Sequence, residues 1–261
     1  MKPKFKRITA GLTAVLLIVL VFLFANSVVG NPISKFLATK DIKQYLATTY
    51  PGNDYKIDDV SFNFKFHEYN GTIISPSSKD STFTITWRDS NNIYDTYDFN
   101  VLQRENTIQR YEKEASEQIS SLLNSIPGND IKKVNVVIAK EYYETGASRS
   151  LVLDSPYDKS TNIPLELTIS CNDSATLEKF TTLLEQIHTL TSSNGYHINY
   201  YSIDHYEEDD LTLTLSANNI TPKEIEGGHL LSLLKNSINE TLSNDNEGAY
   251  DDRSLYVFSK E

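Results

Sequence analysis

Residues 8–29 read ITAGLTAVLLIVLVFLFANSVV, an uncharged stretch whose most apolar part runs from Leu12 to Ala25. A transmembrane helix needs about 20 mostly apolar residues to cross the hydrocarbon core of a bilayer, and this stretch has that length. Four of the seven residues before it are lysine or arginine, and none is acidic. The sequence therefore predicts that residues 1–30 form a basic cytoplasmic start and a transmembrane signal-anchor helix.

The basic start also predicts the orientation, because lysine and arginine next to a span are retained on the cytoplasmic side. We expect a single-pass protein of the cell membrane with its C-terminal domains extracytoplasmic. Lys35, Lys40 and Lys43 follow the span closely and weaken this bias without reversing it. A cleaved signal peptide remains the alternative, since residues 28–30 (VVG) could act as a cleavage site. A lipid anchor at this segment is excluded because the only cysteine is Cys171.

The remaining chain is long and acidic. Removing residues 1–30 leaves 231 of the 261 residues, enough for two ordinary domains with their own cores. Four of the 24 basic residues precede the span, which leaves 20 against 35 acidic residues. Such a part repels phosphate backbones and anionic headgroups, so we expect no nucleic-acid partner and no peripheral lipid-binding surface. A solvated acidic surface is the simplest interpretation, with cations or basic partners as the alternative.

Residues 31–126 are predicted to form an N-terminal α+β domain. A helix opens near Pro32 or Ser34, and strands with alternating apolar residues follow from residue 55. The pair Asn70-Gly71 predicts a tight hairpin between the first two strands. The apolar face of the first strand is expected to hold Val60, Phe62, Phe64 and Phe66, and that of the third strand Phe83, Ile85 and Trp87. A helix over residues 108–126 is expected to cover this sheet.

Residues 127–261 are predicted to form a second α+β domain. Beyond a strand at residues 134–138, the pattern gives a strand ending at Cys171, a helix over residues 177–191 and a hairpin over residues 197–217. A helix with a capping box at residues 221–224 and a last strand at residues 255–258 complete it. This order is that of a ferredoxin-like fold. The fold class is therefore α+β: a transmembrane helix and two small domains with antiparallel sheets.

No catalytic, cofactor-binding or metal residue is predicted. The chain has no Gly-x-Ser-x-Gly, Ser-x-x-Lys or His-Glu-x-x-His motif and no glycine-rich phosphate loop, which also argues against a nucleotide. The five histidines (His67, His188, His197, His205 and His229) are isolated from cysteine in the sequence. Cys171 is expected on the buried face of a strand, where desolvation keeps a thiol protonated and inert.

Two clusters leave alternatives open. The carboxylates between Asp204 and Asp210 could offer oxygen ligands to calcium, but this stretch lacks the glycine that curls a calcium loop, so a solvated hairpin tip is the simpler interpretation. The pairs Tyr142-Tyr143 and Tyr200-Tyr201 could contribute to a binding face. Adjacent residues on a strand point to opposite faces, so at most one of each pair would join a given surface.

Several short stretches of the chain resemble the YfjL-like proteins of Gram-positive bacteria. The resemblance covers chiefly residues 1–126, and it lies in the basic start and single span, the helix ending at Tyr50-Pro51, and the stretches 30–35 (GNPISK), 75–80 (SPSSKD) and 100–102 (NVL). It implies a membrane-tethered, two-domain protein. The family has no assigned activity, so the resemblance transfers no catalytic motif.

These observations favour a membrane-anchored extracytoplasmic protein that binds another envelope protein or a peptide and has no catalytic activity. The first alternative is an envelope hydrolase whose acid and base come from carboxylates distant in the sequence. The second is a cation-dependent sensor that uses the cluster from Asp204 to Asp210.

Overall fold

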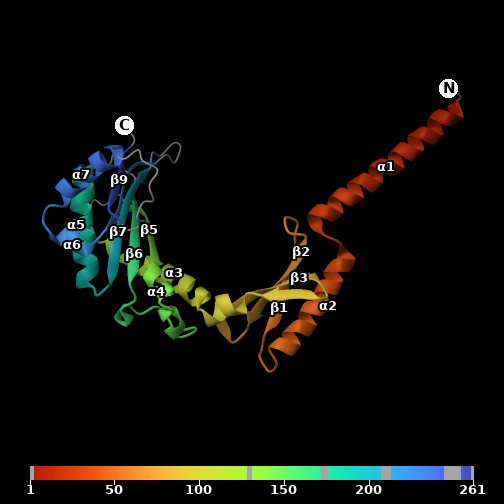
Figure 1. Ribbon diagram of the computed structural model, residues 1–261, viewed down its shortest axis with the longest axis horizontal. Helices are drawn as coiled ribbons and strands as arrows, with labels where there is room; N and C mark the ends of the chain where they lie inside the picture. The colour runs from red at the N-terminus through yellow and green to blue at the C-terminus, as the bar shows by residue number, and fades with distance from the viewer. Residues whose placement is uncertain (1–2, 128–130, 172–175, 207–212, 244–253, 260–261) are drawn as a thin grey trace. The chain divides into compact units, whose positions relative to one another are not determined.

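The computed structural model describes residues 3–127, 131–171, 176–206, 213–243 and 254–259 (Figure 1). The protein is α+β, with an N-terminal apolar helix and two β-sheets, which confirms the predicted fold class at this level. The chain divides into two compact units, residues 1–106 and residues 107–261, each with one of the sheets.

Helix α1 (Pro3–Val29) contains the apolar stretch that opens the chain. Its large apolar side chains between Leu12 and Val21 are all exposed in the part of the chain that the structure describes. A helix that is apolar on every side suits burial in a larger apolar environment, such as the hydrocarbon core of a bilayer. A second helix, α2 (Pro32–Thr49), follows almost at once, and its first turn is capped by Asn31, whose Oδ1 accepts a hydrogen bond from the Ile33 amide at 2.8 Å.

The first sheet is an antiparallel meander in chain order. It consists of β1 (Lys56–Asn63), β2 (Glu68–Ser75), β3 (Ser78–Asp89) and β4 (Asn92–Asp95), and a short π-helical turn (Asp98–Leu102) follows it. Helix α2 lies against β1, β2 and β3 (Figure 1) and buries Ala38, Ile42 and Leu46. The expected apolar face of the third strand is confirmed, because Phe83, Ile85 and Trp87 are buried.

The hairpin predicted at Asn70-Gly71 is wrong. Both residues lie inside β2, where Gly71 pairs with Val60 on one side and Ile85 on the other. The turn instead covers residues 64–67, and His67 adopts the left-handed conformation that a tight turn requires, with φ 52°. Phe64 and Phe66 consequently leave the strand and are exposed, contrary to the expectation that they continue the apolar face.

Gly71 is a glycine because helix α2 approaches the sheet closely at this point. A Cβ at this position would lie 3.1 Å from Cδ1 and 3.2 Å from Cγ2 of Ile42. We therefore expect Gly71→Ala to lower the free energy of unfolding by about 1–3 kcal/mol, the usual cost of overpacking. Urea titration followed by Trp87 fluorescence would measure the loss. Adding Ile42→Val should recover part of the lost stability. If the double variant loses as much stability as the two single variants together, the contact between Gly71 and Ile42 is not the cause.

The second sheet has five strands in chain order: β5 (Ile131–Ile138), β6 (Leu165–Cys171), β7 (Ile198–Tyr206), β8 (Leu213–Ile220) and β9 (Tyr256–Ser259). All neighbours are antiparallel except β6 and β7, which are parallel and directly hydrogen-bonded. A parallel pair needs a crossover connection, and helix α5 (Leu177–Ser193) supplies it. The sheet is therefore mixed, and the expected ferredoxin-like arrangement is not present, since that arrangement separates the two parallel strands.

Helix α3 (Glu105–Leu123) packs in the second unit, not on the first sheet as the sequence predicts. Its buried face (Ile108, Tyr111, Ala115, Ile119 and Leu123) belongs to the same core as β5 and β6. Polar side chains fix it to the edge of β5: the Val136 amide donates to Ser116 Oγ at 2.9 Å and the Ile138 amide donates to Glu112 Oε1 at 2.9 Å. The division between the units falls after Asn106, in the first turn of this helix, whereas the sequence predicts a boundary between residues 126 and 127.

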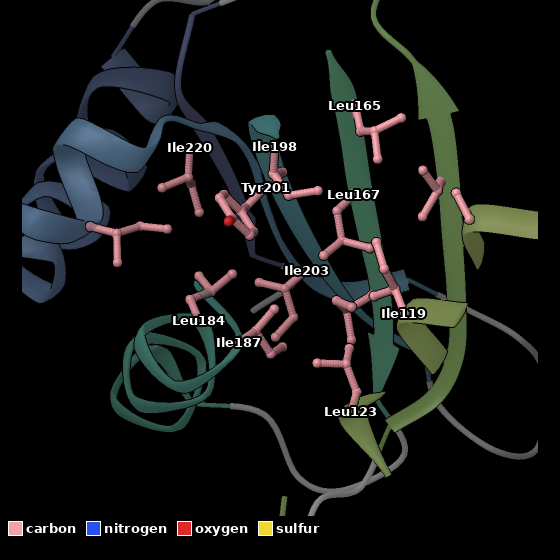
Figure 2. Close-up of a cluster of buried hydrophobic side chains, with 14 of the residues drawn as sticks. Ile119, Leu123, Leu165, Leu167, Leu184, Ile187, Ile198, Tyr201, Ile203 and Ile220 are labelled. Atoms are coloured by element: carbon pink, nitrogen blue, oxygen red, sulfur yellow. The ribbon is translucent and has the colours of Figure 1, made fainter. Parts of the chain in front are cut away.

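The remaining helices of the second unit are α4 (Lys140–Glu144), α6 (Pro222–Glu226) and α7 (Leu230–Ser243), with short 3₁₀ turns at Ala147–Ser150 and Lys159–Thr161. Helices α5, α6 and α7 lie together beside the sheet in Figure 1. In the core, Leu184 and Ile187 of α5 and Ile119 and Leu123 of α3 surround Leu167 and Ile203 of the sheet (Figure 2). The capping box at Thr221 and Glu224 is present as predicted.

Candidate functional site

Among the described residues, α1 provides the one helical stretch that is long and apolar enough to cross a membrane, and none of its most apolar window is buried. This supports the predicted span by length and composition. A retained anchor and a signal sequence near the N-terminus both meet this criterion.

The polar clusters of the first unit hold α2 against the sheet. Asp41 accepts hydrogen bonds from Trp87 Nε1 at 3.0 Å and Ser90 Oγ at 2.6 Å, and these bonds hold the pKa of its carboxyl below the usual range. Further along the helix, the hydroxyls of Tyr45 and Tyr50 both donate to Asp95 Oδ2 at 2.8 Å. Both carboxylates therefore link α2 and its C-terminal end to the first sheet.

This arrangement predicts loss of stability at alkaline pH. Burial and the hydrogen bond to Asp95 raise the pKa of Tyr45 to about 12, and the same causes raise the pKa of Tyr50 further. Because an unfolded tyrosine has a pKa of about 10, the stabilisation is complete below that pH and is lost as the pH rises through the folded value. Urea titrations followed by Trp87 fluorescence at increasing pH would measure the decline. The double variant Tyr45→Phe/Tyr50→Phe should flatten it, and an unchanged slope would contradict the assignment.

The second sheet has one buried face and one open face. Along β6 the residues Leu165, Leu167, Ile169 and Cys171 are buried, whereas Glu166, Thr168 and Ser170 between them are only partly covered. The open face carries polar side chains in rows that the strand register defines. One row joins Lys133, Ser170, Asp204, Ser216 and Phe258 across the five strands. In this row Lys133 and Phe258 are exposed, Ser170 and Asp204 are half-buried, and Ser216 is buried.

Asp204 lies at the centre of this open face. Its Oδ1 accepts a hydrogen bond from Ser216 Oγ at 2.7 Å, and the Asn218 side-chain amide donates in turn to Ser216 Oγ. Burial and the nearby Asp204 carboxylate raise the pKa of the Tyr206 and Tyr256 hydroxyls, which therefore stay protonated at neutral pH. The face presents hydrogen-bond donors and aromatic rings around the Asp204 carboxylate, a combination suited to binding.

The tyrosine pairs that the sequence singled out behave differently. In β7, Tyr201 is buried in the core while Tyr200 is part of the open face, as the alternation along a strand predicts. Tyr142 and Tyr143 lie in helix α4, not in a strand, and both pack against the core of the second unit.

His188 has neighbours that its sequence position does not reveal. Its Nδ1 lies 3.0 Å from the Tyr201 hydroxyl, and its Nε2 lies 3.1 Å from Glu226 Oε1. The hydroxyl, imidazole and carboxylate follow the order of a catalytic relay, and burial raises the pKa of Tyr201 to about 12. These contacts join α5, β7 and α6.

Cys171 and the acidic stretch carry no further site among the described residues. Cys171 is buried, as predicted, and forms no disulfide. Asp204 and His205 lie in β7, whereas residues 207–210 of the proposed cation site lie outside the described residues. No group of three or more potential metal ligands occurs in the part of the chain that the structure describes. The cation-sensor alternative therefore stays a prediction.

The described residues of the second unit include four surface hollows of about 400–570 Å³. The largest lies between Ile126 at the end of α3 and the Thr182, Glu185 and Leu190 side of α5. Each of the four has at most one carboxylate among its lining residues. The paired acid and base that the hydrolase alternative requires are not found in these hollows.

Comparison with protein families finds two matches that follow one another along the chain. The YfjL-like N-terminal domain matches residues 5–98, and the YfjL-like C-terminal domain matches residues 114–235. The interval between them includes the division between the two units of the structure. No curated protein and no solved structure matches the chain. Since the two domains together cover most of the sequence, the chain belongs to the YfjL-like family.

Proposed function

We propose that this protein is anchored in the cell membrane by α1, with both units outside the cytoplasm, and that the open face of its second sheet binds another envelope protein or a peptide. No catalytic step is part of this function. The observation that carries the proposal is the open face itself, where Tyr200, Tyr256 and Phe258 lie on the strands around Asp204. The anchoring part of the proposal rests on α1, whose residues from Leu12 to Ala25 are apolar on every side of the helix.

The basic residues before the apolar span support the orientation. Lys2, Lys4, Lys6 and Arg7 precede the span, and lysine and arginine in this position keep an N-terminus in the cytoplasm. The part beyond the span carries an excess of acidic residues, which keeps it soluble and lowers its affinity for anionic polymers.

The chemistry of the open face supports a peptide partner. Aromatic side chains provide a large contact area, and protein interfaces are enriched in tyrosine for this reason. Serine, threonine and asparagine along the rows can exchange hydrogen bonds with a peptide backbone. The central carboxylate and the acidic surroundings favour a partner segment with lysine or arginine, because complementary charges accelerate encounter and exclude acidic competitors.

Site-specific photo-crosslinking tests this proposal. A photoreactive amino acid would replace Tyr200 or Phe258 in the full chain, and intact cells would be irradiated. Both positions should yield a crosslink to the same partner, and Asp204→Asn should lower the yield. The matched control is the exposed Lys223 of α6, which lies outside the open face. Repeated irradiation without a crosslink, or equal crosslinking at Lys223, would contradict the proposal.

A further inference from the structure

The first unit exposes five large apolar side chains close to the end of α1. Three lie on the first two turns of α2, where Ile33 is 71% exposed, Phe36 69% and Leu37 43%. Two lie in the turn between β1 and β2, where Phe64 is 53% exposed and Phe66 64%. We call these five side chains the exit surface. Single exposed apolar residues are common, but a group of five beside a membrane span indicates a contact.

Specific contacts hold the turn between β1 and β2 beside the end of the span. The Tyr69 hydroxyl donates to the Asn31 carbonyl at 2.8 Å and accepts from the Asn31 amide at 2.7 Å. Gly30 packs directly on Phe62, since a Cβ at Gly30 would lie 2.7 Å from Cγ of the Phe62 ring. Its φ of 83° also favours glycine. Phe62 and Tyr69 are paired strand residues just before and just after the turn, so Phe64 and Phe66 lie near residues 30 and 31.

Helix dimensions place the exit surface at the depth of the lipid headgroups. Residues 8–29 extend about 33 Å as a helix, which matches a hydrocarbon core of about 30 Å. Val29 then lies at the edge of the core. Phe36 follows within about 10 Å along the chain, a distance comparable with the interfacial layer of a bilayer.

The local charge also suits a lipid surface, although the exported part as a whole is acidic. Lys35, Lys40 and Lys43 on α2 and Lys65 in the turn are exposed. Asp59, at 3.9 Å from Lys35 Nζ, and Asp41, next to Lys40, offset two of these charges, and Asp58 is exposed nearby. Juxtamembrane lysines are attracted to anionic headgroups over distances within a Debye length. The net negative charge of the chain beyond residue 30 predicted that it has no lipid-binding surface. That average charge does not describe the end of the first unit next to α1.

We infer that the exit surface lies in the headgroup layer of the same bilayer that α1 spans, so that the first unit rests on the membrane. This inference depends on the anchoring role of α1 that is part of the proposed function. Phe64 and Phe66 enter the interface from the turn, and Ile33, Phe36 and Leu37 enter it from α2. The Lys65 side chain between the two phenylalanines contacts the headgroups.

Depth-dependent quenching of a fluorescent label tests the inference on the full chain. The protein would be placed in nanodiscs of phosphatidylcholine with a minority of phosphatidylglycerol, in a Cys171→Ala background. An environment-sensitive dye would be attached through Lys65→Cys in the turn or through Asn53→Cys, an exposed residue at the opposite end of β1. We expect lipids with a quencher near the headgroup to quench the dye at residue 65 several-fold more than the dye at residue 53.

The variant Phe64→Ser/Phe66→Ser provides the matched comparison, because both side chains are exposed and their replacement should leave the fold intact. It should lower the quenching at residue 65 toward the value at residue 53. Equal quenching at the two positions without this substitution would overturn the inference. If the dye at residue 65 is shielded from the quencher only in discs that hold two copies of the protein, the exit surface contacts a second copy. This result would also overturn the inference. Failure of the anchor itself is distinguishable, since the protein would then not remain with the nanodiscs.

Discussion

Ile119→Ala is expected to destabilise the second unit and to leave the first unit unchanged. Ile119 is fully buried and lies in the core that α3 shares with the second sheet (Figure 2). Truncation of a buried isoleucine costs about 2–5 kcal/mol, because it removes apolar contacts and leaves a cavity. With a urea m-value of a few kcal/mol/M, the unfolding midpoint of this unit should fall by about 1–2 M.

The two units can be followed separately because the chain has one tryptophan, Trp87, which is buried in the first unit. Circular dichroism reports both units, whereas tryptophan fluorescence reports the first alone. We expect Ile119→Ala to lower the unfolding midpoint of the second unit, which circular dichroism detects. The midpoint of the first unit, which Trp87 fluorescence detects, should stay unchanged. The exposed Glu117 of the same helix is the control, and Glu117→Ala should change stability by less than about 0.5 kcal/mol. A shift of the Trp87 transition with Ile119→Ala would favour the arrangement predicted from the sequence, with α3 on the first sheet.

Two arginines in the middle of α1 are expected to prevent membrane integration. Ile18 and Val19 lie near the centre of the span, where each arginine costs about 2.5–3.5 kcal/mol on the scale derived from insertion experiments. Ile18→Arg/Val19→Arg therefore makes insertion less favourable by about 6 kcal/mol, including the lost apolar side chains. Extraction of membranes at alkaline pH should retain the unchanged protein in the pellet and release the variant.

The apolar pair Ile18→Leu/Val19→Leu is the matched control and should remain in the pellet. The same fractionation distinguishes the retained anchor from a cleaved signal peptide. A cleaved protein would be shorter than the full chain and would be released at alkaline pH without any substitution. Recovery of such a product would show that α1 is not a permanent anchor.

The helices and strands of this fold were largely predictable from the sequence. Which of them pack or pair with one another was not. Period-two patterns located β3 and β6, and the three- and four-residue spacing located α3 and α5, because these patterns depend on residues close in the chain. The packing of α3 depends on bonds such as that from the Ile138 amide to Glu112, which join distant residues. The neighbouring parallel strands β6 and β7 were missed for the same reason, since the order of elements does not define the order of strands in a sheet.

The Asn70-Gly71 error has a local physical cause. This pair is typical of tight hairpins, but glycine is also required where a helix packs closely on a strand, and the contact with Ile42 serves that purpose. The open face was predictable only in part. Alternation along the strand separated Tyr200 from Tyr201, but the rows that surround Asp204 come from the pairing of five strands. No motif in the sequence indicates that pairing.

The central claim is that α1 crosses the membrane and that both units lie outside the cytoplasm. Single cysteines in a Cys171→Ala background test it directly, with Lys4→Cys before the span and Ser192→Cys on the exposed side of α5. A thiol reagent that cannot cross membranes would be added to intact, wall-stripped cells. We predict labelling at residue 192 without permeabilisation and at residue 4 only after it. Labelling of residue 192 only after permeabilisation would contradict the claim.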